Sequence, residues 1–286
     1  MSRLVEVEAQ KKAVGTIVTL TSVFEGLASM RIAQVKNQVQ QSEQFFNELW
    51  QIYRQLRADS LFSFGREHTE EVIDKQLFVI VSSEGGFSGD IDQKLINWML
   101  SQFAPDKQDL IVIGHHGAIL LTQAGVKFKK YFTLPSRDKN INVEPLVSEV
   151  RRYKSTSVFY QTYVSLMVQD IKRIELQTAV QQQGQRVRGK ATETDEISEQ
   201  NYIFEPSSFE VIAHLERSMT QIALSQVILD SKLAQYASRF RAMSMANDRA
   251  DEWLNDLNLQ YNRTKRRTQD ERLKEMINGL RRAVAA

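Results

Sequence analysis

The chain of 286 residues is nearly neutral, moderately apolar and free of cysteine. Its 37 lysines and arginines against 35 aspartates and glutamates leave a formal charge of +2. This balance does not predict a nucleic-acid surface, which carries a concentrated basic excess. Without cysteine, disulfides and thiolate metal sites are excluded. No apolar run reaches the roughly 18–20 residues that span a bilayer, and Glu6 and Glu8 interrupt the first apolar residues, unlike a secretory signal. We expect a soluble protein.

The first sixty residues predict a long helix, because they contain no proline and only two glycines, Gly15 and Gly26. Proline costs a helix interior about 3 kcal/mol and glycine about 1. A loose helical pattern of apolar residues runs through this segment, and Ala28 and Ala33 would allow a second helix to approach closely. The pattern comprises Leu4, Val7, Val14, Ile17, Leu20, Phe24, Leu27, Val35, Phe46, Leu49 and Ile52.

Residues 61–206 indicate a small α/β domain. Residues 77–81 and 110–113 are short, fully apolar runs that are typical of central strands, and each precedes a helical pattern. Strand, helix, strand, helix predicts parallel pairing with right-handed crossovers. The apolar stretches between residues 158 and 178 fit either strand or helix, and residues 181–200 have the composition of a flexible loop.

Two features of this domain could suggest chemistry. The turn Ser83–Gly89 lies between a strand and a helix, where a phosphate cradle would be, but it matches neither G-x-G-x-x-G nor a P-loop. We therefore favour a structural turn. His115 and His116 end the second strand, and we expect a surface pair, because a metal site would need carboxylates that the sequence does not place. Catalytic residues, cofactor-binding residues and metal ligands are all expected to be absent.

The C-terminal segment predicts a second, longer helix. Roughly 70 residues beyond Ser207 contain neither glycine nor proline, enough for about 100 Å of helix at 1.5 Å per residue. Steps of three and four connect apolar positions in a heptad pattern, which is typical of a helix-on-helix seam. Ser207 or Ser208 offers an N-cap. The seam comprises Ile212, Leu215, Met219, Ile222, Gln226, Leu229, Leu233, Tyr236, Phe240, Met243, Asn247, Ala250, Leu254, Leu257 and Tyr261.

The character of this helix changes after Tyr261. Residues 262–272 contain no apolar side chain, and then Leu273, Met276, Ile277 and Leu280 resume the apolar pattern. Three interpretations of the polar stretch remain open: a solvated face, a nucleic-acid grip, or a collar of polar contacts to a surrounding protein.

The expected fold class is an α/β insert, with Rossmann-like alternation, between two long helices that form an antiparallel coiled coil. The boundaries are 1–60 for the N-terminal helix, 61–206 for the α/β domain and 207–286 for the C-terminal helix. Because the first helix leads into the domain and the last leaves it, the two must run antiparallel. We expect Phe24 and Leu27 to pack against the C-terminal seam. The alternative is two ordinary helices of a bundle.

Several motifs resemble the gamma subunit of rotary F-type ATP synthases and ATPases, and the resemblance covers essentially the whole chain. Arg239-x-x-Ala242-Met243-x-x-Ala246-x-Asp248 is similar to the family's R-x-x-A-M-x-x-A-x-D. Further similar segments are Leu257-x-Leu259-x-Tyr261-Asn262, the Tyr202–Pro206 entry to the long helix, the Ser83–Gly89 turn and Gly114–Gly117.

This resemblance implies a non-catalytic central rotor shaft without a cofactor. It couples rotation of a membrane ring of c subunits to conformational changes in a catalytic hexamer of alpha and beta subunits, with an epsilon subunit as a further partner and no nucleic acid. It implies a peripheral position on the cytoplasmic face of the bacterial inner membrane. The implied partner-contact residues are Arg239, Met243, Lys265, Arg266, Asp270, Leu273 and Ile277.

Lys265, Arg266 and Asp270 differ from the family's residues at these positions. The differences suggest either that the contact residues of the catalytic head have changed together with these positions, or that the chain is a divergent paralogue whose complex only hydrolyses ATP. Two functions of other classes also remain: a nucleotide-binding α/β enzyme with a helical appendage, and a free coiled-coil scaffold. ATP binding would distinguish the first, and co-purification with a hexameric ATPase would distinguish the second.

Overall fold

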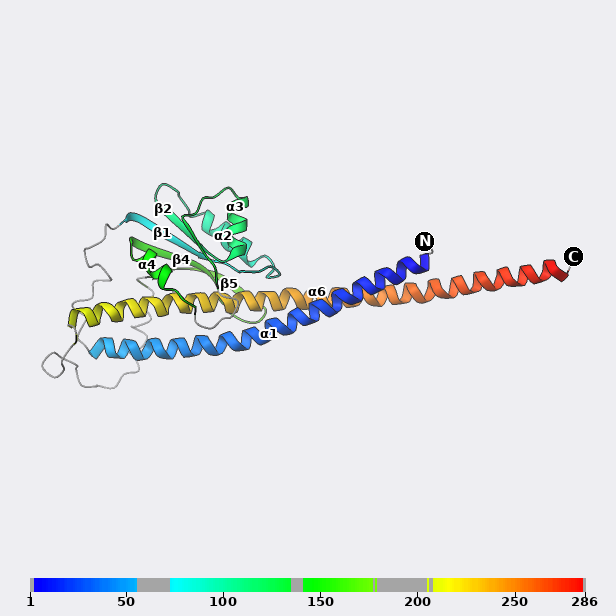
Figure 1. Cartoon of the computed structure of the whole chain (residues 1–286), viewed down its shortest axis with the longest axis horizontal. Coiled ribbons are helices and arrows are strands. Elements are labelled where there is room, and N and C mark those ends of the chain that lie inside the picture. Colours follow the sequence, from blue (N-terminus) through cyan, green and yellow to red (C-terminus); the bar gives the residue numbers. More distant parts are fainter. Residues whose placement is uncertain are drawn as a thin grey trace. The chain divides into compact units, whose positions relative to one another are not determined.

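The computed structural model describes residues 3–55, 73–134, 141–176, 178, 205 and 208–284 (Figure 1). The chain divides into two compact units, residues 1–28 with 240–286 and residues 29–239. Two long helices, α1 (Arg3–Gln55) and α6 (Ser208–Val284), contribute residues to both units. Both helices begin and end inside the ranges expected from the sequence. The expected loop at 181–200 and the segment 202–204 lie outside the described residues.

A five-stranded sheet in the order β3-β2-β1-β4-β5 forms the centre of the second unit (Figure 1). The first four strands in this order pair in parallel, which confirms the prediction for residues 77–81 and 110–113. The segment that the sequence left unassigned is an antiparallel hairpin of β4 and β5. The strands are β1 (Ile73–Val81), β2 (Gln108–Ile113), β3 (Lys130–Phe132), β4 (Tyr153–Tyr163) and β5 (Gln169–Glu175).

Each face of the sheet has its own apolar core, because alternate residues of a strand point to opposite faces. Phe78 and Ile80 pack with α2 (Ile91–Leu100) and α3 (His115–Gln123). Leu77, Val79 and Val81 pack with α4 (Glu144–Val150), with Phe46 and Trp50 of α1 and with residues of α6 between Met219 and Ile228. The sheet therefore fixes the carboxyl ends of β1 and β2 beside α6 within this unit.

Candidate partner-contact surfaces

The seam expected on α6 is covered in the structure. Between Leu215 and Tyr261 every seam position is buried or half-buried, with Met219 fully buried and Leu257 only 3% exposed. The side chain of Ile212 lies outside the described residues. The heptad pattern therefore identified the covered side of this helix correctly.

The covered side of α1 differs from the prediction. Val7, Val14, Thr21 and Ala28 recur at intervals of seven and are all buried, whereas Leu27 is 47% exposed. The expectation that Leu27 packs against the C-terminal seam is therefore wrong, whereas Phe24, at 36% exposed, has most of its side chain covered. Seven residues make about two helical turns, so this spacing returns to one side of the helix. The expected pattern included Val7 and Val14, but it left out Thr21, because that residue is polar.

Within the first unit, apolar and polar contacts join the two helices. Val7 and Val14 cluster with Leu257. The Thr21 hydroxyl donates a hydrogen bond of 2.8 Å to Asn247 Oδ1. This bond explains how the α6 seam accommodates the polar Asn247, because a covered amide without a partner would be costly.

Large apolar side chains lie beside and behind the buried positions of α1 and remain exposed. A stretch of 18 residues in this helix is strongly apolar and mostly exposed. By length and composition α1 could cross a membrane. The expectation that no segment is long and apolar enough to span a bilayer is therefore wrong. A soluble helix with a partner on its apolar side meets the same criterion. The exposed residues of this apolar stripe are Ile17, Leu20, Val23, Phe24, Leu27 and Met30, between 36% and 66% exposed.

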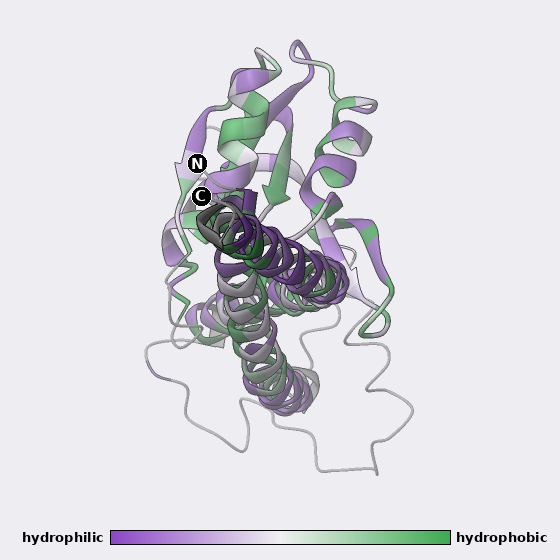
Figure 2. Cartoon of the chain, turned by 90° about the vertical axis from the view of Figure 1, so that its right-hand side faces the viewer, coloured by the Kyte–Doolittle hydropathy of each residue, from purple (hydrophilic) through white to green (hydrophobic). Residues whose placement is uncertain are grey.

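The last part of α6 is a single exposed helix. Every residue from 269 to 281 is exposed in the structure, including Leu273 at 55% and Ile277 at 42%. Figure 2 shows that this helix is largely hydrophilic towards its C-terminus, whereas more hydrophobic residues lie along α1. Within the polar stretch, Arg267 pairs with Glu271 at 2.9 Å. The apolar residues at 273–280 thus lack cover among the described residues.

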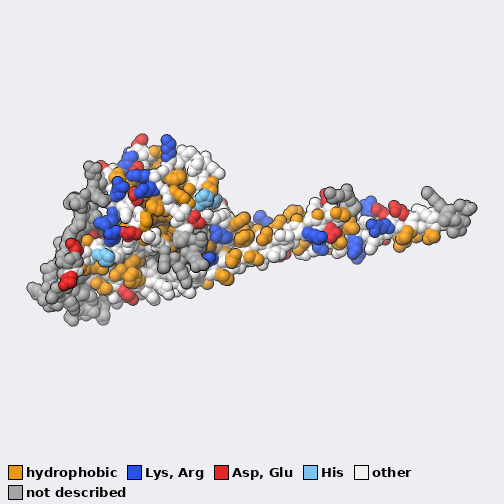
Figure 3. Space-filling model, viewed as in Figure 1, with side chains coloured by type: hydrophobic (Ala, Val, Ile, Leu, Met, Phe, Trp, Pro, Cys, Tyr) orange, Lys and Arg blue, Asp and Glu red, His pale blue; other side chains and the backbone are white. Residues whose placement is uncertain are grey.

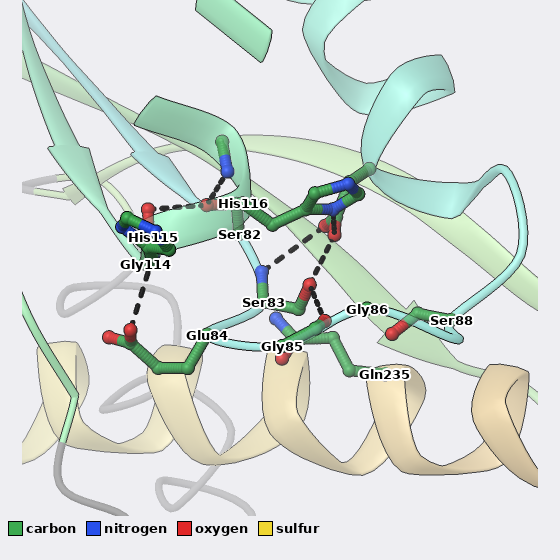
Figure 4. Close-up of polar contacts among 12 residues, drawn as sticks. Ser82, Ser83, Glu84, Gly85, Gly86, Ser88, Gly114, His115, His116 and Gln235 are labelled. Atoms are coloured by element: carbon green, nitrogen blue, oxygen red, sulfur yellow. Dashed lines mark hydrogen bonds and ion pairs between the residues drawn. The ribbon is translucent and has the colours of Figure 1, made fainter. Parts of the chain in front are cut away.

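A buried hydrogen-bond network fixes the turn that follows β1 in the second unit (Figure 4). Its centre is Asp92, in the first turn of α2 and 1% exposed. The Asp92 carboxylate accepts hydrogen bonds from the Ser83 hydroxyl and, at 2.7 Å, from the Gln161 amide. Gln161 in turn accepts a hydrogen bond from Ser231 of α6. The network therefore joins the turn, the sheet and α6.

The two histidines of α3 have different surroundings. His115 is exposed, as predicted, but His116 Nδ1 lies 2.7 Å from the Asp92 carboxylate. A hydrogen bond to Asp92 raises the pKa of His116, burial opposes this change, and the negative charge of Asp92 adds to it. The prediction of a simple surface pair is wrong for His116. No spacing rule in the sequence signals this contact, because Asp92 and His116 come together only through the sheet.

Arg239 of α6 is held against the same turn. Its guanidinium donates to the backbone carbonyl oxygens of Gly85 and Gly86, at 3.4 and 3.2 Å, and to the Ser88 hydroxyl at 3.3 Å. It also lies over the Tyr236 ring, 5.5 Å from the centroid. The arginine thus has partners within its own chain.

Close packing explains the glycines beside this turn. Gly114 has φ +99°, and a Cβ there would lie 2.2 Å from the Ser82 carbonyl oxygen. A Cβ on Gly117 would lie 2.2 Å from the Ser82 hydroxyl. A phosphate at the turn would meet the carboxylate of Asp92, so this arrangement favours a structural turn over a phosphate cradle. Among the described residues no cluster of three metal-ligating side chains occurs.

The residues that the sequence suggested as partner contacts fall into two groups. Met243 is 7% exposed in the seam, and Arg239 is occupied by the turn. The other five are exposed on α6: Lys265, Arg266, Asp270, Leu273 and Ile277.

The sequence of the chain was compared with protein families and with known proteins. A family model described as ATP synthase matches residues 3–281. The chain belongs to the ATP synthase gamma family. Relatives named ATP synthase gamma chain from Mesoplasma florum and Mycoplasmoides gallisepticum are both 22% identical. The matches cover 98% of this chain in each case, and 98% and 99% of the respective relatives.

Solved structures share the fold of this gamma-family chain. The central stalk of the Tetrahymena thermophila mitochondrial ATP synthase, solved with its c-ring, matches 79% of this chain and 99% of its own with 14% identity and a TM-score of 0.56. A chain of the Euglena gracilis mitochondrial ATP synthase matches 90% of this chain and 93% of its own length, with 12% identity and a TM-score of 0.52.

Proposed function

We propose that this gamma-family chain is the central rotor shaft of an F-type ATP synthase or ATPase. It would couple rotation of a membrane ring of c subunits to conformational changes in a catalytic hexamer of alpha and beta subunits. Family membership over residues 3–281 supports this role, and so does the fold shared with a central stalk.

The observation that carries the proposal is the exposed apolar stripe of α1. Leu20 and Leu27 are 51% and 47% exposed, although Thr21 and Ala28 beside them are buried. Contiguous apolar surface of this kind marks an interaction site, and covering it is favourable at about 25 cal/mol per Å². A sleeve formed by the alpha and beta subunits would cover it.

The seam of the shaft would be an antiparallel coiled coil of α1 and α6. Two contacts in the first unit support this pairing: Val7 and Val14 cluster with Leu257, while Thr21 bonds Asn247. Later residues of one helix thus meet earlier residues of the other.

The surrounding head would contact the exposed residues of α6. Lys265, Arg266 and Asp270 would form a polar collar, and Leu273 and Ile277 would be sheathed by the top of the hexamer. Arg239 and Met243 would instead position the turn and the seam, because their side chains are already engaged within the chain.

The shaft would act without chemistry of its own. It would bind no cofactor, and its rotation would present different faces to each catalytic subunit, because coupling requires contacts that differ between states. An epsilon subunit would be a further partner, and the complex would lie on the cytoplasmic face of a bacterial inner membrane.

Co-purification with alpha and beta subunits from the same source tests the proposal. The parent chain is expected to co-purify, and Leu20→Ser/Leu27→Ser to lose at least about tenfold in affinity, which corresponds to 1.4 kcal/mol. The matched control, Val164→Ser/Val168→Ser, changes two exposed apolar residues of the β4–β5 hairpin, 60% and 54% exposed, and should not affect binding. Failure of the parent to co-purify would favour a free scaffold, and ATP binding by the chain alone would favour a nucleotide-binding enzyme.

A further inference from the structure

Basic residues collect where the four parallel strands of the sheet begin. Because β3, β2, β1 and β4 run in the same direction, their amino ends point to the same side of the sheet, although the starts are staggered and Lys130 of β3 pairs with Ile111 within β2. We call this side the basic edge. Among the described residues its cations are Lys75, Lys107, Lys127, Lys129, Lys130, Arg151, Arg152 and Lys154, and its carboxylates are Asp74, Asp106, Asp109 and Glu149.

The net positive charge of the basic edge exceeds the net charge of the whole chain. Eight cations against four carboxylates leave four positive charges, whereas the chain has a formal charge of +2. Seven of the eight cations are exposed and Lys75 is half-buried. Figure 3 shows lysine and arginine side chains gathered over the α/β domain. The remainder of the chain is therefore net negative, and the basic charge is local.

The carboxylates of this edge do not neutralise it. Asp109 is shared between Lys75 and Lys129, at 3.5 and 3.4 Å. Glu149 is likewise shared between Lys130 and Arg152. In the part of the chain that the structure describes, three exposed cations have no carboxylate partner: Lys107, Lys127 and Arg151.

A side-chain cluster keeps the centre of the edge ordered. The Tyr153 hydroxyl donates to Asp109 at 2.8 Å and lies 2.6 Å from the Lys129 amine, which also lies over the Tyr153 ring. Burial would raise the pKa of Asp109, but hydrogen bonds from Tyr153 and Lys129 outweigh it and lower that pKa. Asp109 thus stays ionised and holds two lysines at the edge.

We propose that the basic edge docks on the anionic headgroups of a membrane surface. The proposal rests on the proposed function, which places the chain beside a membrane ring. The charges are spread over about 14 Å, three spacings of about 4.8 Å between neighbouring strands, which suits a layer of headgroups. Single-stranded nucleic acid would need exposed aromatic residues for stacking, and Tyr153 at the centre is only 4% exposed.

Vesicle binding of the full chain tests this surface. Sedimentation would compare vesicles of phosphatidylcholine alone with vesicles that mix phosphatidylcholine and phosphatidylserine in equal amounts. Binding to neutral vesicles measures any contribution of the apolar stripe of α1. The difference in affinity between anionic and neutral vesicles measures the contribution of charge. A basic residue near an anionic surface changes affinity about fivefold, so Lys107→Gln/Lys127→Gln/Arg151→Gln should lose about a hundredfold on anionic vesicles only.

A variant of equal charge provides the matched control. Arg263→Gln/Lys265→Gln/Arg266→Gln removes three cations from α6 and should change vesicle affinity less than about threefold. Equal losses in the two variants, or equal binding of the parent to both kinds of vesicle, would overturn the proposal. Loss of binding to random duplex DNA with unchanged vesicle binding would overturn it in favour of a nucleic-acid surface. Co-purification of the edge variant with the alpha and beta subunits should be normal, which separates this test from that of the proposed function.

Discussion

At the scale of single residues, His116 makes the stability of the α/β domain depend on pH. Its raised pKa means that the folded state binds the proton more tightly than the unfolded chain, in which the histidine pKa is about 6.5. The stabilisation by the His116–Asp92 pair is therefore fully present below about 6.5 and is lost as pH rises through the folded pKa.

We predict that His116→Gln removes this part of the pH dependence. Urea unfolding of the parent and the variant at several pH values measures it, and the difference in free energy of unfolding should shrink above the folded pKa of His116. His115→Gln is the control, because His115 is exposed and lies outside the Asp92 pair. A constant difference between parent and variant at all pH values would contradict the sign of the shift.

At the scale of elements, different residues of α1 contribute to the folding stability of the chain and to binding of the alpha and beta subunits. Val14 is 2% exposed and Ile17 is 43% exposed, although they are only three positions apart in the chain. Val14→Ala should lower the free energy of unfolding by about 2 kcal/mol, because it opens a cavity in the seam. Ile17→Ala should change stability by less than about 0.5 kcal/mol but weaken co-purification with the alpha and beta subunits. Chemical denaturation with a parallel pull-down measures both, and equal destabilisation by the two changes would contradict this assignment.

The end of α6 should bind without contributing to folding. Residues 269–281 are exposed throughout, so truncation after Arg272 removes no covered seam position. We predict an unchanged unfolding midpoint and a weaker complex with the hexamer. Circular dichroism melting of the truncated chain checks the first part. Unfolding of the whole truncated chain would show that the removed residues belong to its own core.

The sequence predicted the elements better than the contacts between them. The heptads of α6 and the strands at 77–81 and 110–113 were recognisable, because periodicity and apolar runs are local signals. The seam of α1 was predicted only in part: Val7 and Val14 belonged to the expected apolar pattern and Ala28 was expected to allow close approach, whereas Thr21 was missed because it is polar. The network around Asp92 was missed because Ser83, Asp92, His116 and Gln161 meet only through the sheet, and no spacing along the chain records that meeting.

At the scale of the whole molecule, a rotor shaft must turn as one body inside its partners. The absence of cysteine allows a single label, because Ser148→Cys, at an exposed position of α4, would introduce the one thiol of the chain. Ser148 lies away from both the apolar stripe of α1 and the exposed end of α6 in sequence, so labelling there should leave the proposed hexamer contacts intact.

The most direct test attaches a bead to Ser148→Cys in a complex with immobilised alpha and beta subunits and records its motion while ATP is hydrolysed. The account predicts stepwise rotation in one direction, which stops when ATP is removed. A bead that stays still while the complex hydrolyses ATP, with the chain demonstrably bound, would contradict the role of a central rotor shaft.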